Sequence, residues 1–134
     1  MAKVVAFNLI SLDGFFEAAD QTIDWFNVDE EFNAFALNQL KTVEAIFYGR
    51  KTYEGMYEYW TSEMAMQSDP EMSTLMNETK KVVFSKTLTS LKWKNAELIS
   101  NDLPSKISEL KNTYSKDIIV YGSGDLISSL VNLQ

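Results

Sequence analysis

Apolar positions repeat with two different periods along the chain, and the two patterns alternate from one segment to the next. Continuous runs rich in β-branched and aromatic residues are typical of buried strands and cover residues 3–10, 45–48, 80–85, 96–99 and 117–121. Apolar residues three and four positions apart are typical of amphipathic helices and cover residues 29–41, 50–60, 104–114 and 125–131. A further helix is predicted to begin near Pro70, whereas residues 15–28 follow neither period.

This alternation predicts an α/β fold: a three-layer sandwich in which a mostly parallel central sheet has helices on both faces. The first run, residues 3–10, is predicted to form a buried strand, and the chain then turns at Asp13 and Gly14. No repeat or linker interrupts the pattern, so residues 1–134 are expected to form a single domain.

The composition excludes several kinds of chemistry. None of the 134 residues is cysteine or histidine, which removes zinc sites built from thiolate or imidazole as well as Cys-His and Ser-His-Asp catalysis, and no metal is expected. The 12 basic and 19 acidic side chains leave a net charge of −7, which argues against nucleic acid as a partner. Unbroken apolar runs are far shorter than the roughly 20 residues that cross a bilayer, so we expect a cytoplasmic protein without a membrane partner.

The segment VYGSGDLISSL places two glycines between a buried strand and a helix. Glycine lets a ligand approach the backbone closely, and free amides at a helix start bind anions, so a pyrophosphate would suit this turn. The third glycine of the dinucleotide-binding fingerprint is replaced by Ile127. A plain connecting turn therefore remains an open interpretation of the same residues.

Two other predicted strands end in cations beside hydroxyl groups. The carboxyl ends of parallel strands face the ligand crevice of an open sheet, so such groups would together suit a polyanion. The alternative is that they are solvated surface cations, the usual fate of Arg-Lys pairs. The segments are Gly49-Arg50-Lys51-Thr52, which holds the only arginine of the chain, and Ser85-Lys86-Thr87.

Four segments, taken in order, resemble the dihydrofolate reductase-like family: SLDG (11–14), GRKTYE (49–54), Met76-Asn77 before KKVVFSKTL (80–88), and DIIVYGSGDLISSL (117–130). Within that family the chain is most similar to the C-terminal reductase domain of the bifunctional riboflavin-biosynthesis deaminase/reductase and its stand-alone bacterial relatives. The resemblance covers essentially the whole chain and implies a dihydrofolate reductase-like sandwich that binds NADPH. The family usually continues into a C-terminal strand pair, so part of the sheet is expected to be missing from this chain, which is either a fragment or completed by a partner.

The resemblance also implies a role for each matching residue. The cation and hydroxyl of the GRKT segment would hold the adenosine-side phosphates of NADPH, the next strand end would border the 2′-phosphoribose, and the glycine turn would cradle the pyrophosphate. The cofactor-binding residues implied are Gly49, Arg50, Lys51, Thr52, Ser85, Lys86, Gly122, Ser123, Gly124, Asp125 and Leu126.

On the substrate side, the resemblance implies that Ser11, Asp13 and Gly14 lie in a loop that lines the nicotinamide and the substrate. The family uses a carboxylate on the first helix as proton donor, and Asp29 or Glu30 lies near that place. Acids in a first helical turn are usually explained by their attraction to the helix dipole and by solvation. Both interpretations of these two acids stay open.

The favoured prediction is an NADPH-dependent reductase that transfers hydride to a small heterocycle, either a riboflavin-pathway aminopyrimidine or a pterin-like molecule. The alternative is a non-catalytic nucleotide-binding or dimerisation domain of the same fold. A flavodoxin-like module is disfavoured, because its phosphate loop should follow the first strand, where SLDGFF has few hydroxyls. Besides the small-molecule substrate we expect a second copy as partner, because an open apolar sheet edge is usually paired, so a homodimer is predicted.

Overall fold

A computed structural model describes residues 1–133 and shows one sheet of five strands in the order β1-β5-β2-β3-β4, with every neighbouring pair parallel. The strands are β1 (Val4–Phe7), β2 (Val43–Gly49), β3 (Lys80–Phe84), β4 (Ala96–Ile99) and β5 (Asp117–Tyr121). The helices are α1 (Glu30–Thr42), α2 (Arg50–Trp60), α3 (Glu63–Ser68), α4 (Pro70–Glu78), α5 (Leu103–Thr113) and α6 (Gly124–Val131). The predicted α/β class is confirmed.

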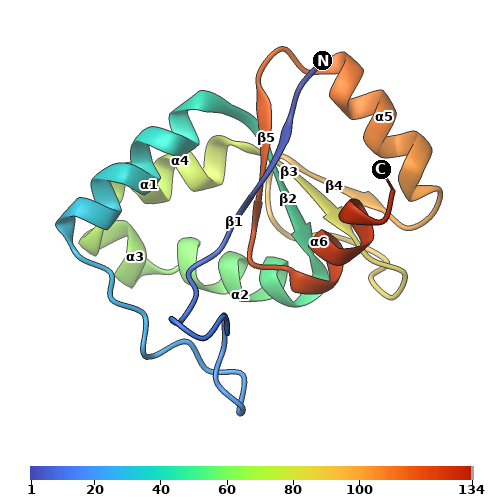
Figure 1. Cartoon of the computed structure of the whole chain (residues 1–134). Helices are drawn as coiled ribbons and strands as arrows, with labels where there is room; N and C mark the ends of the chain where they lie inside the picture. The colour runs from blue at the N-terminus through green and yellow to red at the C-terminus, as the bar shows by residue number, and fades with distance from the viewer. Residues whose placement is uncertain (134) are drawn as a thin grey trace.

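Two hydrophobic cores lie on the two faces of the sheet, because successive side chains of a strand point to opposite sides. On β2, Ala45 and Phe47 face the core that α5 and α6 cover, and Ile46 and Tyr48 face the core that α1, α2 and α4 cover. Figure 1 shows α1 to α4 on one side of the sheet and α5 and α6 on the other. This is the predicted three-layer arrangement.

The first strand is not buried as predicted. β1 lies at the edge of the sheet and pairs only with β5 among residues 1–133, and the side chain of Val5 is 40% exposed. A β-branched apolar run identifies a strand, but its place in the strand order depends on pairings with distant residues. The prediction of a buried strand was wrong for this reason.

Periodicity gives no sign of α3, since its six residues are too few to establish a helical repeat. Ser62 caps this helix by accepting a hydrogen bond from the amide of Ala65, which is buried. Residues 1–133 include no helix that has both the length and the apolar character needed to span a membrane.

A fully buried lysine, Lys81, lies at the amino end of β3. The Lys81 ammonium donates hydrogen bonds to the backbone carbonyls of Met76 and Asn77, both 2.9 Å away, at the C-terminal end of α4. It also lies 4.4 Å from the ring centre of Trp93, within range of a cation–π interaction. Burial lowers the pKa of Lys81 to about 8, with the nearby Lys94 acting in the same direction.

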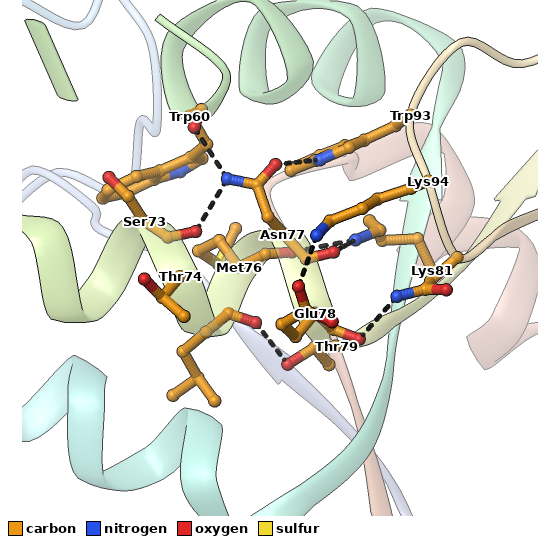
Figure 2. A network of polar contacts seen from close by, with 12 residues as sticks. Trp60, Ser73, Thr74, Met76, Asn77, Glu78, Thr79, Lys81, Trp93 and Lys94 are labelled. Carbon is orange, nitrogen blue, oxygen red and sulfur yellow. Dashed lines mark hydrogen bonds and ion pairs between the residues drawn. The ribbon is translucent and has the colours of Figure 1, made fainter. Parts of the chain in front are cut away.

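Asn77, in α4, connects its helix to two other parts of the chain beside Lys81, as Figure 2 shows. Its side-chain nitrogen donates to the carbonyls of Trp60 and Ser73, and its side-chain oxygen accepts the indole N–H of Trp93 at 2.7 Å. Both polar atoms of this amide group are hydrogen-bonded, so a substitution at Asn77 would leave the Trp60 carbonyl and the Trp93 indole N–H without partners. The Met76-Asn77 segment, part of the family resemblance, supports the fold at the end of β3 opposite Ser85 and Lys86.

Candidate functional site

A cavity of about 690 Å³ lies at the carboxyl edge of the sheet. Its walls come from the ends of β2, β3 and β4 and the starts of α2, α5 and α6, which are widely separated in sequence. Open parallel sheets bind ligands at this edge. All of the predicted cofactor residues except Gly122 line the cavity: Gly49, Arg50, Lys51, Thr52, Ser85, Lys86, Ser123, Gly124, Asp125 and Leu126.

The glycine turn is tied directly to the start of α2. The Ser123 hydroxyl accepts a hydrogen bond from the amide of Gly49 at 2.9 Å, and the amide of Ser123 donates to the Thr52 hydroxyl at 3.2 Å. Gly122 and Ser123 both have left-handed backbones, with φ of 55° and 52°. A left-handed serine is strained, so these two bonds hold the turn in a shape that leaves the start of α6 facing the cavity.

Three helices that border the cavity lack a capping side chain. At the starts of α2, α5 and α6 the N-cap residue makes no side-chain hydrogen bond to the helix, whereas Asp29, Ser62 and Asp69 cap α1, α3 and α4. Uncapped starts leave backbone N–H groups free and carry the positive end of the helix dipole. The described residues thus concentrate anion-binding potential at the carboxyl edge.

Cations accompany these helix starts. Arg50 pairs with Glu54 at 3.0 Å and the Lys51 ammonium contacts the Gln21 side chain at 3.3 Å, while Lys86 is exposed and forms no ion pair with any described residue. The first turn of α2 contains no acid, although acids stabilise that position and cations destabilise it. The helix dipole therefore does not explain the cations at this helix start, whereas an external anion would, although the acids Glu17, Asp102 and Asp125 also line the cavity.

The rest of the cavity wall comes from residues that the sequence analysis did not predict. Phe16 and Glu17 line the cavity, and the Phe16 ring would lie 2.7 Å from a Cβ atom added at Gly124. The turn between β4 and α5 also contributes, through Ser100, Asn101 and Asp102. A signal for this turn was present, because polar residues follow the predicted strand at 96–99, whereas nothing local to Phe16 indicates its position.

A family model for the RibD C-terminal domain matches residues 2–133. The chain belongs to the RibD C-terminal domain family. It is 32% identical over 126 residues to YyaP of Bacillus subtilis (strain 168), described as uncharacterized, and the match covers 92% of this chain but only 64% of YyaP. A crystal structure from Shewanella sp. PV-4, of a protein named for riboflavin biosynthesis, has a TM-score of 0.61 at 23% identity, over 98% of this chain and 70% of that one, and supports the fold.

In this RibD C-terminal domain, the predicted substrate loop lies outside the cavity. Ser11, Asp13 and Gly14 form a turn whose Asp13 and Gly14 are exposed, and the Ser11 hydroxyl donates to the Asp13 carboxylate and accepts a hydrogen bond from the amide of Phe15. Gly14 has φ of 91°, which explains why glycine stands there. The same loop reaches the cavity two residues later, at Phe16, so the substrate role of the three predicted residues remains a prediction.

The two candidate proton donors begin α1. The Asp29 carboxylate accepts the amide of Phe32 at 2.8 Å, so Asp29 is the N-cap, and Glu30 is exposed in the first turn. Neither lines the cavity. Their catalytic role is a prediction that these contacts leave open, while the capping and dipole interpretation accounts for both positions.

Two buried tyrosines complete the carboxyl edge of this domain on the α1 side. Tyr48 is the penultimate residue of β2 and Tyr121 the last of β5, and neither hydroxyl has a hydrogen-bond partner among the described residues. Burial raises the pKa of Tyr121 to about 12 and that of Tyr48 well above its usual value, so both hydroxyls keep their protons at neutral pH.

Proposed function

We propose that this chain is an NADPH-dependent reductase that transfers hydride to a small heterocycle, a riboflavin-pathway aminopyrimidine or a pterin-like molecule. The observation that carries the proposal is the meeting of three uncapped helix starts with Arg50, Lys51 and Lys86 around one cavity. Membership of the RibD C-terminal domain family supports a riboflavin-pathway, reductase-like domain.

The residues present fit the cofactor. The free amides at the start of α6, beside Gly124, would hold the pyrophosphate, and Arg50, Lys51 and Thr52 would hold the adenosine-side phosphates. Ser85 and Lys86 would border the 2′-phosphate. A protein of net charge −7 repels such a polyanion unless cations are placed locally, as these are. When bound, NADPH supplies the hydride, and the protein orients the reacting groups.

A pair of fluorescence titrations tests the proposal. NADPH is expected to bind about tenfold more tightly than NADH, since one additional charged hydrogen bond to the 2′-phosphate accounts for that factor. Oxidation of the bound NADPH is then followed with candidate aminopyrimidines and pterins. Failure to bind NADPH would contradict the assignment of the cavity, and equal affinity for both cofactors would contradict the 2′-phosphate site.

A non-catalytic nucleotide-binding domain is the second candidate. The observation that favours it is the position of Asp29 and Glu30, because one is engaged as a helix cap and neither lines the cavity. Tight NADPH binding without oxidation by any heterocycle would support this candidate over the reductase.

We also propose that the chain forms a homodimer through the edge of the sheet. β1 offers an unpaired strand edge, with Val5 exposed, and open edges of this kind are usually covered. Sedimentation velocity is expected to show a dimer. A monodisperse monomer at high concentration would contradict this proposal and leave the reductase proposal unaffected.

A further inference from the structure

Ser123 connects two of the helix starts that border the cavity. Strands β2 and β5 are paired, and Figure 1 shows α2 and α6 beginning next to each other at the same end of the sheet. The Ser123 hydroxyl accepts the amide of Gly49, the N-cap of α2, and donates its proton to the carbonyl of Tyr121, the last residue of β5, at 3.1 Å. The backbone amide of Ser123 donates to the Thr52 hydroxyl in α2. These hydrogen bonds join the turn after β5 both to its own strand and to α2.

The same bonds use both of the protons that Ser123 can donate. A serine has one backbone N–H and one hydroxyl proton, and a phosphate is bound by hydrogen-bond donors and cations. The N–H is taken by Thr52 and the hydroxyl proton by the Tyr121 carbonyl, so Ser123 lines the cavity without a donor for a phosphate. The Thr52 hydroxyl differs, because it accepts a hydrogen bond and donates to no atom of residues 1–133. Its proton is available to a ligand.

The backbone conformation of Ser123 shows that the start of α6 does not account for this serine. A serine at an N-cap usually accepts an amide of the helix that it begins, but the Ser123 side chain makes no such bond to α6. Its φ of 52° and ψ of 54° lie in the left-handed region, which glycine adopts with less strain. The serine is therefore explained by its bonds to β5 and α2 and not by helix formation.

The preceding glycine allows the turn to lie close to α2. Gly122 also has a left-handed backbone, with φ of 55°. A Cβ atom added there would lie 3.3 Å from the hydroxyl oxygen and 3.4 Å from the methyl carbon of Thr52. A side chain at this position would push α2 away from the turn and disturb the hydrogen bond between Ser123 and Thr52. Gly122 and Ser123 together therefore fix the position of the turn against α2.

We propose that Ser123 is a positioning residue, which holds the starts of α2 and α6 in a fixed relation so that both act on the same phosphates, and that it does not itself bind them. The inference rests on the proposed function and deepens it, because it separates the predicted cofactor residues into those that bind and one that positions. The amides at the start of α6, the Thr52 hydroxyl and Arg50 would contact the phosphates. Groups already held in place lose less entropy when the ligand binds.

The first test compares two substitutions of the same residue. Ser123→Gly and Ser123→Ala both remove the hydroxyl, but only glycine also relieves the left-handed backbone, so the glycine variant should have the higher melting temperature. Each is expected to bind NADPH about tenfold more weakly in a fluorescence titration. If Ser123 only supported the fold, affinity would follow stability and the glycine variant would bind more tightly than the alanine variant. Ser128→Ala, an exposed site on α6 outside the cavity, is the control and should bind NADPH normally.

The second test measures the coupling between the two helix starts. Arg50→Ala is expected to weaken NADPH binding about tenfold in the unaltered protein but only about threefold in Ser123→Gly protein, because a loosened α2 start already holds Arg50 less well. Two independent substitutions would instead give a combined loss of about 100-fold. In Ser128→Ala protein the effect of Arg50→Ala should stay about tenfold.

Inorganic pyrophosphate, titrated in parallel by calorimetry, separates this inference from the proposed function. It keeps the group that the two helix starts would hold and lacks both nucleosides, so Ser123→Gly should weaken its binding as well. The inference is overturned if Ser123→Gly protein binds both ligands as tightly as the unaltered protein, or if the losses from Ser123→Gly and Arg50→Ala simply multiply. Binding of pyrophosphate without NADPH would overturn the proposed function, and the pyrophosphate comparison would still decide the role of Ser123. Binding of neither ligand would overturn both.

Discussion

The two ends of β3 use lysine in opposite ways. At the amino end, Lys81 is completely buried, donates to two carbonyls at the C-terminal end of α4 and lies over Trp93. Just beyond the carboxyl end, Lys86 is exposed and makes no ion pair among the described residues. Lys81 therefore makes its interactions within the fold, whereas Lys86 is available to contact a ligand.

The helix dipoles explain why the cations at the two ends of β3 differ in their interactions. The C-terminal end of a helix carries partial negative charge, so the end of α4 attracts Lys81 and the interaction is satisfied within the protein. The start of a helix carries partial positive charge, so Arg50 and Lys51 at the start of α2 add to a positive potential, although Arg50 also pairs with the exposed Glu54. Cations beside helix starts therefore indicate an external anion, and cations beside helix ends do not.

The largest expected effect is on stability, at the amino end of β3 where Lys81 is buried. Asn77→Ala removes three hydrogen bonds and leaves the Trp93 indole N–H and the Trp60 carbonyl without partners, so the free energy of unfolding should fall by about 3 kcal/mol. Urea denaturation measures this loss. Asn38→Ala, an exposed site on α1, is the control and should change stability by less than about 0.5 kcal/mol. A fall in NADPH affinity of folded Asn77→Ala protein would show that the two ends are coupled.

The buried lysine should make stability depend on pH. With a pKa of about 8 when folded and 10.5 when unfolded, Lys81 releases its proton first in the folded state, so stability rises as pH increases from 8. A gain of about 2 kcal/mol is expected by pH 9.5, before the buried tyrosines, whose pKa values are raised, begin to act in the opposite direction. Denaturation at several pH values should show this gain, and a Lys81→Met variant should lack it.

At the carboxyl edge of the sheet, where the cavity lies, Gly124→Val should lower NADPH affinity more than it lowers the stability of the fold. The new side chain would meet the Phe16 ring and block approach to the amides at the start of α6, and NADPH affinity should fall about 30-fold, or about 2 kcal/mol. The Phe16 ring lies on a loop and can move aside, so the change in melting temperature should be small. Gly55→Val, where an added Cβ meets nothing, is the control. Equal NADPH affinity in the two variants would remove the glycine turn from the site.

The smallest expected effect concerns cofactor preference. Arg50→Ala should lower NADPH affinity about tenfold, or about 1.4 kcal/mol, and leave NADH affinity close to its original value. Lys41→Ala is the control, because Lys41 pairs with Glu71 on the surface away from the cavity. If the Arg50 variant keeps its preference for NADPH, the 2′-phosphate contact belongs to another residue, and Lys86 is then the first to replace.

Much of the fold and of the cavity could be predicted from short stretches of sequence. Each strand and each long helix has a period that a few neighbouring residues establish, and the strand-end rule brings Arg50, Lys86 and Gly124 to one edge without further information. The sequence by itself therefore determined the α/β class. It also identified residues of the cavity wall, since all of the predicted cofactor residues except Gly122 line the cavity.

Features that depend on contacts between residues far apart in the sequence were decided only by the tertiary structure. The edge position of β1, the Phe16 ring over Gly124 and the burial of Lys81 against α4 and Trp93 each involve pairings that no local pattern records. The hydroxyls of Tyr48 and Tyr121 belong to the same class, because two aromatic residues in apolar runs look like ordinary core until their missing partners are known. Local sequence specifies conformation through backbone and side-chain periodicity, whereas burial and hydrogen bonding depend on which segments the folded chain brings together.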